Sequence, residues 1–366
     1  MIAVELALPR PVPPVLGLGA FLKNTVAVVD GPCARVSQDV GNTDTADAIT
    51  RMEAAARALL TGLDRAPAAV AHDLHPDFPA SRLAAALAAE LGVPAVAVQH
   101  HHAHVVATAA EAGHDGPLLG LAFDGFGLGP DRQAWGGELL LVNGGRMERL
   151  GHLAPLLQPG GDVAAREPWR MGAAALHALG RGDETAARWP DQPAAAHLAR
   201  IMARGVNCPP TSSAGRLFDA ACGLLNVHPV AAFEGQAPMA LERLVTAPQV
   251  LAGGWTVDAA GVLDLTPLLA ALADCREAER AAGAALFHGT LAAAVADWVM
   301  QALGRRGDLP GVIAFAGGCF YNKVLSADLA ARLEGQGLRV LRPQRLGPGD
   351  PAVSLGQAWA AACSLP

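Results

Sequence analysis

The chain has 366 residues, of which 52% are hydrophobic, and a formal net charge of −7 with a sequence pI near 5.9. This length exceeds what one compact core usually holds, so two lobes are expected. The acidic balance provides no uniform basic field, which disfavours nucleic acid as the main partner.

Neither the cysteines nor the N-terminus indicates export. The six cysteines are scattered and include no C-x-x-C pair, which favours reduced thiols and a cytoplasmic location. The opening stretch "MIAVELALPRPVPPV" has no basic region and breaks into prolines, so no signal peptide is expected. The longest uncharged stretches fall short of a membrane span, and we predict no membrane association.

The first part of the chain shows a hairpin followed by alternating strands and helices. The polar turn 37–47 contains Asp and Thr residues suited to capping the helix that follows. The predicted order is a Pro-rich leader (1–15), two hairpin strands (15–22 and 24–29), a helix (46–62), a strand (68–74), a helix (80–92) and a strand (95–99).

The same order then restarts. It comprises strands at 117–127 and 136–145, a mainly helical middle, strands at 311–322 and 338–343, and a final helix at 352–363. This duplication predicts an α/β, actin-like (ASKHA, RNase H-like) fold of two lobes with a nucleotide cleft between them. We expect an N-terminal lobe of residues 1–115 and a C-terminal lobe of residues 116–366, with the final helix packing back on the first lobe.

Four histidines occur within the five positions 100–104. If a helix starts near Gln99, His100 and His104 lie one turn apart on one face, where two imidazoles can reach the same ion. His101 and His102 point elsewhere. A histidine-rich helix start on the surface is the alternative, and the spacing alone leaves it open.

Two aspartates could complete a metal site. Asp124 ends a strand in "AFDGFG", and Asp350 precedes the last helix in "GPGDPAV". Two histidines with one or two carboxylates suit Fe(II), Mn(II) or Zn(II). Each aspartate taken alone is equally compatible with a turn or a helix cap.

Glycine-rich turns at 124–129, 135–138 and 316–318 could bring backbone amides close to phosphates. No P-loop pattern is present. In "SSAGRLFDAACGLL" a glycine turn precedes a helix, and Asp219 could accept hydrogen bonds from ribose hydroxyls while Gly215 allows the base to approach. An ordinary amphipathic helix with an acidic residue is the alternative.

Considered together, these stretches resemble one family. The order and spacing resemble those of the C-terminal half of the HypF family, carbamoyltransferases of [NiFe]-hydrogenase maturation, from about residue 14 onward. The stretches are "LKNT" (22–25), "VAHDLHPDF" (70–78), "VQHHHAHVVA" (98–107), "LAFDGFGLGPDRQAWGGELL" (121–140), "GGDVAAREPWRM" (160–171), "GRLFDAACGLL" (215–225), "FEGQAPMALE" (233–242), "AGGCFYNKVL" (316–325) and "LGPGDPAVSLGQA" (346–358).

The resemblance implies roles for individual residues. His100, His104, Asp124 and Asp350 match the metal ligands of the family. The positions that would hold the nucleotide are Lys23, Asn24, Gly125, Gly136, Gly137, Gly215, Arg216, Asp219, Gly317, Gly318 and Asn322. The positions expected around the carbamoyl group or the tail of the partner, and so the catalytic candidates, are His72, His75, Arg166 and Arg170.

The resemblance also implies a reaction. Carbamoyl phosphate and ATP would give carbamoyl adenylate, and the carbamoyl group would pass to the C-terminal cysteine of the partner maturation protein HypE, for synthesis of cyanide ligands. The implied cofactors are ATP with magnesium and a divalent metal, iron or zinc. Cys319, beside a glycine turn, is expected to be packed and not nucleophilic.

Some features depart from the family. The acylphosphatase-like domain, the zinc-finger cysteine pairs and the adenylate-forming domain of full-length members are missing from this sequence, and Met1 before a coherent leader favours a naturally short form. Pro351 and Ala352 stand where the family usually has two glycines, so the loop around Asp350 is expected to be less open. Carbamoylation of a small-molecule hydroxyl and an idle ATP-binding scaffold are the alternatives.

Overall fold

The computed structural model describes residues 2–365. The elements of the first part of the chain are β1 (Ile2–Gly17), β2 (Ala27–Ser37), α1 (Ala46–Thr61), β3 (Ala69–Asp73), α2 (Pro79–Leu91), β4 (Ala95–Val98) and α3 (His100–Glu111). Those of the second part are β5 (Leu118–Leu128), β6 (Ala134–Asn143), β7 (Arg146–Leu153), β8 (Leu156–Leu157), α4 (Val163–Arg166), α5 (Pro168–Ala178), α6 (Thr185–Arg188), α7 (Ala195–Ala203), β9 (Pro210–Thr211), α8 (Ala214–Leu224), α9 (Gln236–Arg243), β10 (Thr256–Val257), β11 (Val262–Asp264), α10 (Thr266–Ala273), α11 (Arg280–Arg305), β12 (Val312–Ala316), α12 (Lys323–Gly335), β13 (Arg339–Leu341) and α13 (Val353–Ser364).

The strands form two sheets built on the same plan. The first has the order β2-β1-β3-β4, and the second has the order β10-β11-β7-β6-β5-β12-β13, with β8 and β9 attached beside β6. In each sheet an antiparallel hairpin comes first, and two parallel strands are then added on the far side of its first strand. The duplication predicted from the order of elements is therefore present in the strand pairing.

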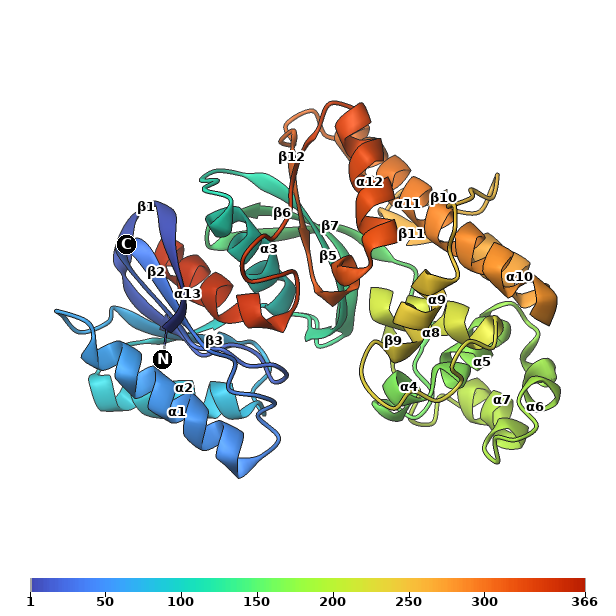
Figure 1. Ribbon diagram of the computed structural model, residues 1–366, viewed down its shortest axis with the longest axis horizontal. Coiled ribbons are helices and arrows are strands. Elements are labelled where there is room, and N and C mark those ends of the chain that lie inside the picture. Colours follow the sequence, from blue (N-terminus) through green and yellow to red (C-terminus); the bar gives the residue numbers. More distant parts are fainter. Residues whose placement is uncertain (1, 366) are drawn as a thin grey trace.

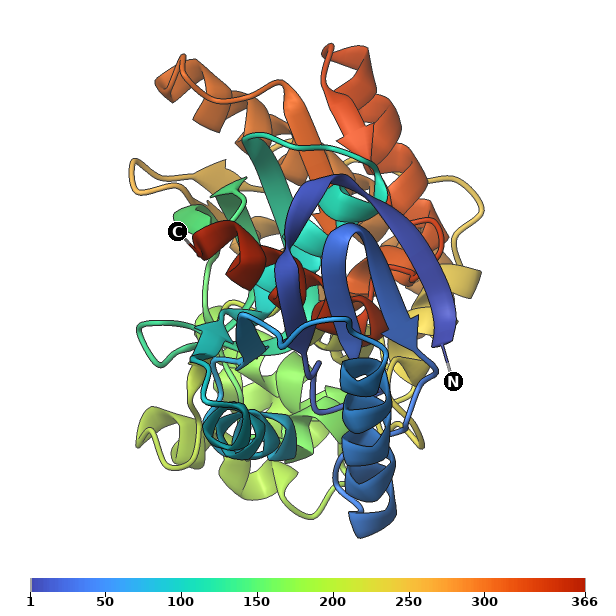
Figure 2. The same ribbon diagram turned by 90° about the vertical axis from the view of Figure 1, so that its left-hand side faces the viewer.

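Two helices each follow one sheet in the chain but pack on the other. α3 follows the last strand of the first sheet yet packs on β5, β6 and β12 of the second. α13 follows the last strand of the second sheet and packs on β1, β2 and β3 of the first, side by side with α3 (Figure 1). Figure 2 shows the blue β1–β2 hairpin in front of the red α13. The division of the chain at residues 115–116 stays a prediction.

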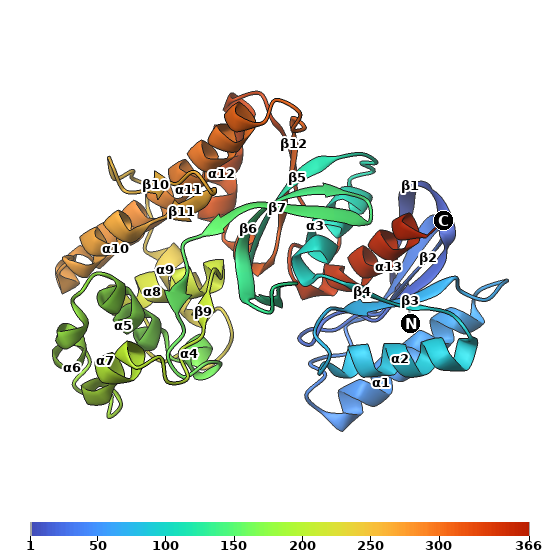
Figure 3. The same ribbon diagram turned by 180° about the vertical axis from the view of Figure 1, so that it is seen from behind.

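Both sheets alternate their side chains between two cores. On β5, Leu119, Leu121 and Phe123 face the core shared with α5, α8 and α11, whereas Leu118 and Ala122 face the core shared with α3 and α13. The first sheet does the same: one face packs on α13 and the other on α1 and α2 (Figure 3). Because side chains of a strand alternate, the position of each residue in this pattern decides which face it serves.

The predicted Pro-rich leader is wrong. Residues 2–17 form β1, which pairs with β2 from Ile2↔Ser37 to Gly17↔Ala27. The register shifts between Ala7 and Val12 and again between Val12 and Val15, and the four prolines of this strand fall within these two intervals. Proline lacks a donor, but bulges and strand edges tolerate it, so a strand that looks broken in the sequence remains paired.

One segment, Glu277–Arg305, contains an 18-residue stretch that is long and apolar enough to span a membrane by length and composition. In the structure 83% of that stretch is buried inside the protein. It contains α11, whose apolar residues contribute to the core of the second part of the chain. We interpret it as a core helix.

Candidate metal centre

The four histidines lie at the buried start of α3. Gln99 caps the helix, because its side-chain oxygen accepts a hydrogen bond from the backbone N–H of His102 at 2.9 Å. The helix therefore begins at His100, and the spacing of four places His104 on the same face. His101 contacts the Gln99 side chain, and His102 Nε2 contacts the carbonyl of Gly144 at 2.7 Å. All four rings are buried, which excludes the surface alternative.

His100 and His104 converge with two carboxylates. Their Nε2 atoms are 3.1 Å apart, and Asp124 Oδ2 lies 3.2 Å from each. Asp350 Oδ1 lies 3.7 Å from His100 Nε2 and 3.5 Å from His104 Nε2. One ligand atom from each of the four residues lies within 4.8 Å of all the others. The structure thus brings together the four residues predicted as metal ligands.

Different parts of the fold deliver the two aspartates. Asp124 shares its face of β5 with Ala122, which is the face covered by α3. Asp350 starts a short turn before α13. The loop that leads to it is tied to the end of α3, since the carboxylate of Glu111 accepts backbone N–H groups from Gln344, Arg345 and Leu346.

The residue types and spacing fit a divalent cation. Metal–nitrogen and metal–oxygen bonds of about 2.1 Å in a tetrahedral site place ligand atoms roughly 3.4 Å from each other. The five distances given above that involve an imidazole nitrogen are 3.1 to 3.7 Å. Two imidazoles and two carboxylates, without thiolates, suit iron(II), manganese(II) or zinc(II).

The ionisable groups of the cluster shift one another's pKa. Burial lowers the pKa of His100, but its hydrogen bonds to Asp124 and Asp73 outweigh this effect and hold the pKa well above its usual value. Burial raises the pKa of Asp124, but hydrogen bonds with His100 and His104 hold it well below its usual value. Positive charge is thus favoured between the carboxylates, and a cation at the centre would supply it.

Asp73 is a site residue that the sequence reasoning missed. It is buried, and its Oδ2 lies 2.8 Å from His100 Nδ1. The strand parity of β3 could have found it, because Asp73 shares a face with Ala69 and Ala71, which pack toward α3 and α13.

The two predicted catalytic histidines lie in different places. His72 lies on the opposite face of β3 from Asp73 and contacts the Asp73 carbonyl through Nδ1, so the structure does not bring it to the cluster. His75 stacks on Phe78 at 4.3 Å and meets the edge of Phe126 at 6.3 Å. Phe126 is exposed and follows Asp124 by two residues, which places His75 at the outer side of the cluster.

The turn at Gly136 and Gly137 is occupied by a protein carboxylate. Glu138 is completely buried, and its Oε1 accepts the N–H groups of both glycines at 3.0 and 3.2 Å. Arg149 balances its charge through Nε at 2.6 Å. Both amides therefore already have a hydrogen-bond partner in the protein, and the contact of Gly136 and Gly137 with the nucleotide stays a prediction.

The turn at Gly317 and Gly318 is similar. Gly317 donates its N–H to the carbonyl of Pro348 at 2.8 Å, and Gly318 donates its N–H to Asp124 Oδ1 at 3.0 Å. Asn322 caps α12 by accepting the N–H of Leu325, and its amide nitrogen contacts His288 at 2.9 Å. The turn therefore orients Asp124, and the Asn322 side chain already has structural partners.

The start of α8 lies beside Asp124. Ser213 caps the helix and also donates to the carbonyls of Asp124 and Gly125 at 2.8 and 2.7 Å. A Cβ on Gly215 would lie 3.0 Å from Gly125 Cα, whereas a Cβ on Gly125 would meet nothing within 4 Å. Gly125 thus borders open space next to the cluster.

Arg216 and Asp219 form an ion pair on α8. Arg216 Nη2 lies 2.8 Å from Asp219 Oδ2, although neither Arg216 Nε nor Asp219 Oδ2 makes an aligned hydrogen bond within residues 2–365. Burial raises the pKa of Asp219 to about 6, against the opposing effect of Arg216. Buried polar atoms without aligned partners are suited to receive a polar ligand.

Lys23 and Asn24 have different surroundings. Lys23 is exposed and forms an ion pair with Glu234 at 2.9 Å, joining the first hairpin to the loop before α9. Asn24 is completely buried and donates from its amide nitrogen to the carbonyls of Leu18 and Ala20. The structure therefore gives Asn24 a supporting role in this loop.

The two predicted arginines lie in the helical region around α4 and α5 (Figure 1). Arg166 ends α4 and is exposed. Arg170 pairs with Glu167 and stacks over Trp169 at 4.8 Å. Among the described residues no ion pair or hydrogen bond joins either arginine to the histidine–aspartate cluster, so their catalytic role stays a prediction.

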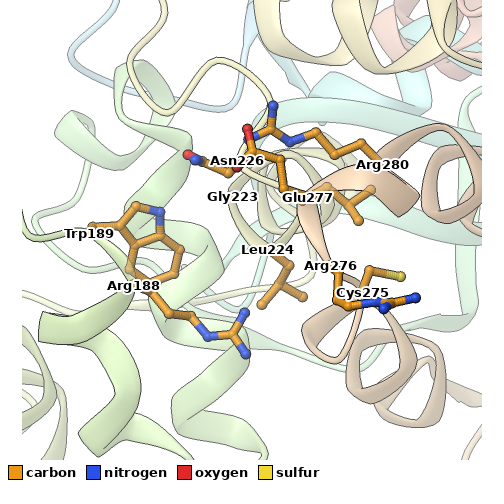
Figure 4. Close-up of a pocket in the computed structure, with 10 residues that line it drawn as sticks. Arg188, Trp189, Gly223, Leu224, Asn226, Cys275, Arg276, Glu277 and Arg280 are labelled. Carbon is orange, nitrogen blue, oxygen red and sulfur yellow. The ribbon is translucent and has the colours of Figure 1, made fainter.

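A separate cavity of about 160 Å³ lies at the far end of α8 and contains none of the predicted site residues (Figure 4). Three arginines line it, but Arg188 pairs with Glu184, Arg276 with Glu279 and Arg280 with Glu277. Since each charge is compensated, the cavity offers no net positive field to an anion.

The fold and the cluster define an actin-like protein with a candidate metal centre where its two halves meet. Residues 10–111 match the family model described as "HypF Kae1-like domain", and residues 120–357 match "Carbamoyltransferase, Kae1-like Domain, second subdomain". The chain belongs to the HypF family.

Curated relatives and solved structures agree with this family assignment. Carbamoyltransferase HypF2 of Cupriavidus necator is 49% identical over 98% of this chain and 47% of its own length. A carbamoyltransferase HypF homolog of the same organism is 47% identical over 95% of this chain and 91% of its own length. Full-length HypF, solved in a phosphate- and nucleotide-bound form, gives a TM-score of 0.88 at 27% identity and covers 98% of this chain and 47% of its own. This likeness confirms the predicted actin-like fold. The chain spans about half the length of most curated relatives it matches.

Proposed function

We propose that this chain transfers a carbamoyl group in [NiFe]-hydrogenase maturation, using carbamoyl phosphate and ATP by way of carbamoyl adenylate. The acceptor is the C-terminal cysteine thiol of HypE, and the product serves cyanide ligand synthesis. The convergence of His100, His104, Asp124 and Asp350 carries this proposal. Family membership and the nucleotide-bound HypF structure support it.

The four residues would hold a divalent iron or zinc ion. When bound, the metal supplies Lewis acidity that polarises the carbamoyl carbonyl or the adenylate phosphate. The start of α8 and Gly125 border the space next to the cluster, where the adenylate, or ATP with magnesium, would lie. Asp219 would accept the ribose hydroxyls.

The chain needs no nucleophile of its own. The acceptor thiol loses its proton to solvent, its sulfur attacks the carbamoyl carbon, the bond from that carbon to the AMP phosphate oxygen breaks, and AMP leaves. Burial raises the pKa of the Cys319 thiol well above its usual value, which keeps it protonated and unreactive. We assign His75, at the outer side of the cluster, to the face from which the acceptor thiol enters.

The test of adenylate formation is exchange of labelled pyrophosphate into ATP by the purified, metal-loaded chain. We expect exchange that requires carbamoyl phosphate and that is lost in the His100→Ala, His104→Ala double variant. Absence of exchange in the wild type would contradict adenylate formation by this chain and would leave only transfer of a group activated elsewhere.

Nucleotide affinity should depend on the ionisation of Asp219. Its pKa is raised to about 6, so the carboxylate predominates above pH 6 and is protonated below it. Since hydrogen bonds to a charged acceptor contribute about 1.5–3 kcal/mol, Asp219→Asn should weaken ATP binding roughly tenfold at pH 8. Titration calorimetry should show weaker ATP binding at pH 5 than at pH 8 in the wild type, and no such difference in this variant.

Asp328→Asn, which changes an acid paired with Arg332 within α12, is the control and should bind as the wild type does. Equal ATP affinity of Asp219→Asn and the wild type at pH 8 would remove Asp219 from the nucleotide site.

A further inference from the structure

Asp73 is a buried carboxylate outside the four predicted ligands. Only 1% of its surface is exposed. Oδ2 lies 2.8 Å from His100 Nδ1, and Oδ1 accepts the backbone N–H of His75 at 2.9 Å. An ionised carboxylate is costly to bury unless it is paired and hydrogen-bonded, and a strand interior could hold an apolar residue instead. Both oxygens of Asp73 are used by groups of the site.

The contact with Asp73 decides which nitrogen of His100 faces the cluster. A carboxylate accepts hydrogen bonds, so His100 Nδ1 carries a proton and donates it to Asp73. In the neutral ring the lone pair then lies on Nε2, the atom 3.2 Å from Asp124 and 3.7 Å from Asp350. A metal ligand needs this tautomer.

The second histidine has no such partner. His104 Nδ1 is buried and makes no hydrogen bond within residues 2–365. The ring of His104 is therefore held by packing in α3, whereas the ring of His100 is held by a charged hydrogen bond from another element, β3. The orientation of the cluster should consequently be more sensitive to Asp73 than to other neighbours of α3.

We propose that Asp73 is a positioning residue that fixes His100 as an Nε2 ligand and so raises the affinity of the cluster for a divalent cation. This inference rests on the metal site of the proposed function. Through its second oxygen Asp73 also fixes the backbone of His75, whose ring stacks on Phe78 and meets Phe126. One carboxylate thus links a metal ligand to the loop at the outer side of the cluster.

The experiment measures cobalt(II) affinity of the full chain by chelator competition, together with the visible absorption of bound cobalt. The variants are Asp73→Asn, which keeps the shape but removes the charge, and Ser81→Ala. Ser81 is the matched control, since its hydroxyl donates to the carbonyls of Asp73 and His75 and supports the same loop without touching His100.

We expect Asp73→Asn to weaken cobalt binding about 10- to 100-fold and to shift the cobalt bands, and Ser81→Ala to stay within about threefold of the wild type. If Asp73→Asn fails to fold, Asp73→Ala, which also removes the carboxylate, is measured against the same thresholds. Wild-type affinity in the Asp73 variant, or an equal loss in Ser81→Ala, would overturn the inference. A wild type that binds no cobalt would contradict the proposed metal site itself.

Discussion

Replacing His100 by alanine should abolish stoichiometric metal binding and lower carbamoyl transfer by about a thousandfold. The substitution removes one of two imidazole ligands and leaves Asp73, Asp124 and Asp350 as three buried or partly buried carboxylates without their shared partner. Loss of Lewis acid assistance corresponds to several kcal/mol in the barrier, and each 1.4 kcal/mol is tenfold in rate. Elemental analysis of the purified protein and a transfer assay measure the two effects.

His102→Gln is the matched control for this variant. His102 lies on the same turn of α3 and is buried, but it contacts the Gly144 carbonyl and not the cluster. Glutamine can donate the same hydrogen bond, so metal content and activity should be retained. Full metal content in His100→Ala, or equal losses in both variants, would contradict the assignment of the site.

The second large effect concerns the contact between α3 and α13. A Cβ on Gly356 of α13 would lie 1.8 Å from the carbonyl oxygen of Ala103, in the turn of α3 between His100 and His104. Because this obstacle is backbone, α3 would have to move. We expect Gly356→Ala to lower the free energy of unfolding by about 3 kcal/mol, at the upper end of typical overpacking, and to weaken metal binding as well.

Denaturant unfolding and cobalt titration measure both effects. Gly304→Ala is the matched control, because Gly304 also lies in a helix but a Cβ there meets nothing within 4 Å. Alanine at that position should stabilise the protein by up to about 1 kcal/mol. If Gly356→Ala were as stable as the wild type, the close α3–α13 contact would not exist as described.

Local patterns made much of the fold and of the central cluster predictable. A spacing of four puts His100 and His104 on one helical face whatever surrounds them, and alternation along β5 assigns Asp124 to one side of its sheet. The order of strands and helices in the sequence indicated the duplication, and the strand pairing of the two sheets shows it.

The partners of individual polar groups and of strands were not predictable in the same way. The amides of Gly136 and Gly137 looked free in the sequence, but a neighbouring residue, Glu138, folds back on them. The prolines of β1 looked like a break because bulges depend on the partner strand. Asp73 escaped notice because its partner, His100, is 27 residues away on α3, with α2 and β4 between them in the chain.

The most direct test is transfer of label from carbamoyl phosphate to HypE by the metal-loaded chain in the presence of ATP and magnesium. The proposed function predicts label on HypE that is lost when its C-terminal cysteine is changed to serine, and lost again when His100 of this chain is changed to alanine. Unlabelled HypE with the wild-type chain, or labelling that survives the His100 substitution, would contradict metal-dependent carbamoyl transfer at this site.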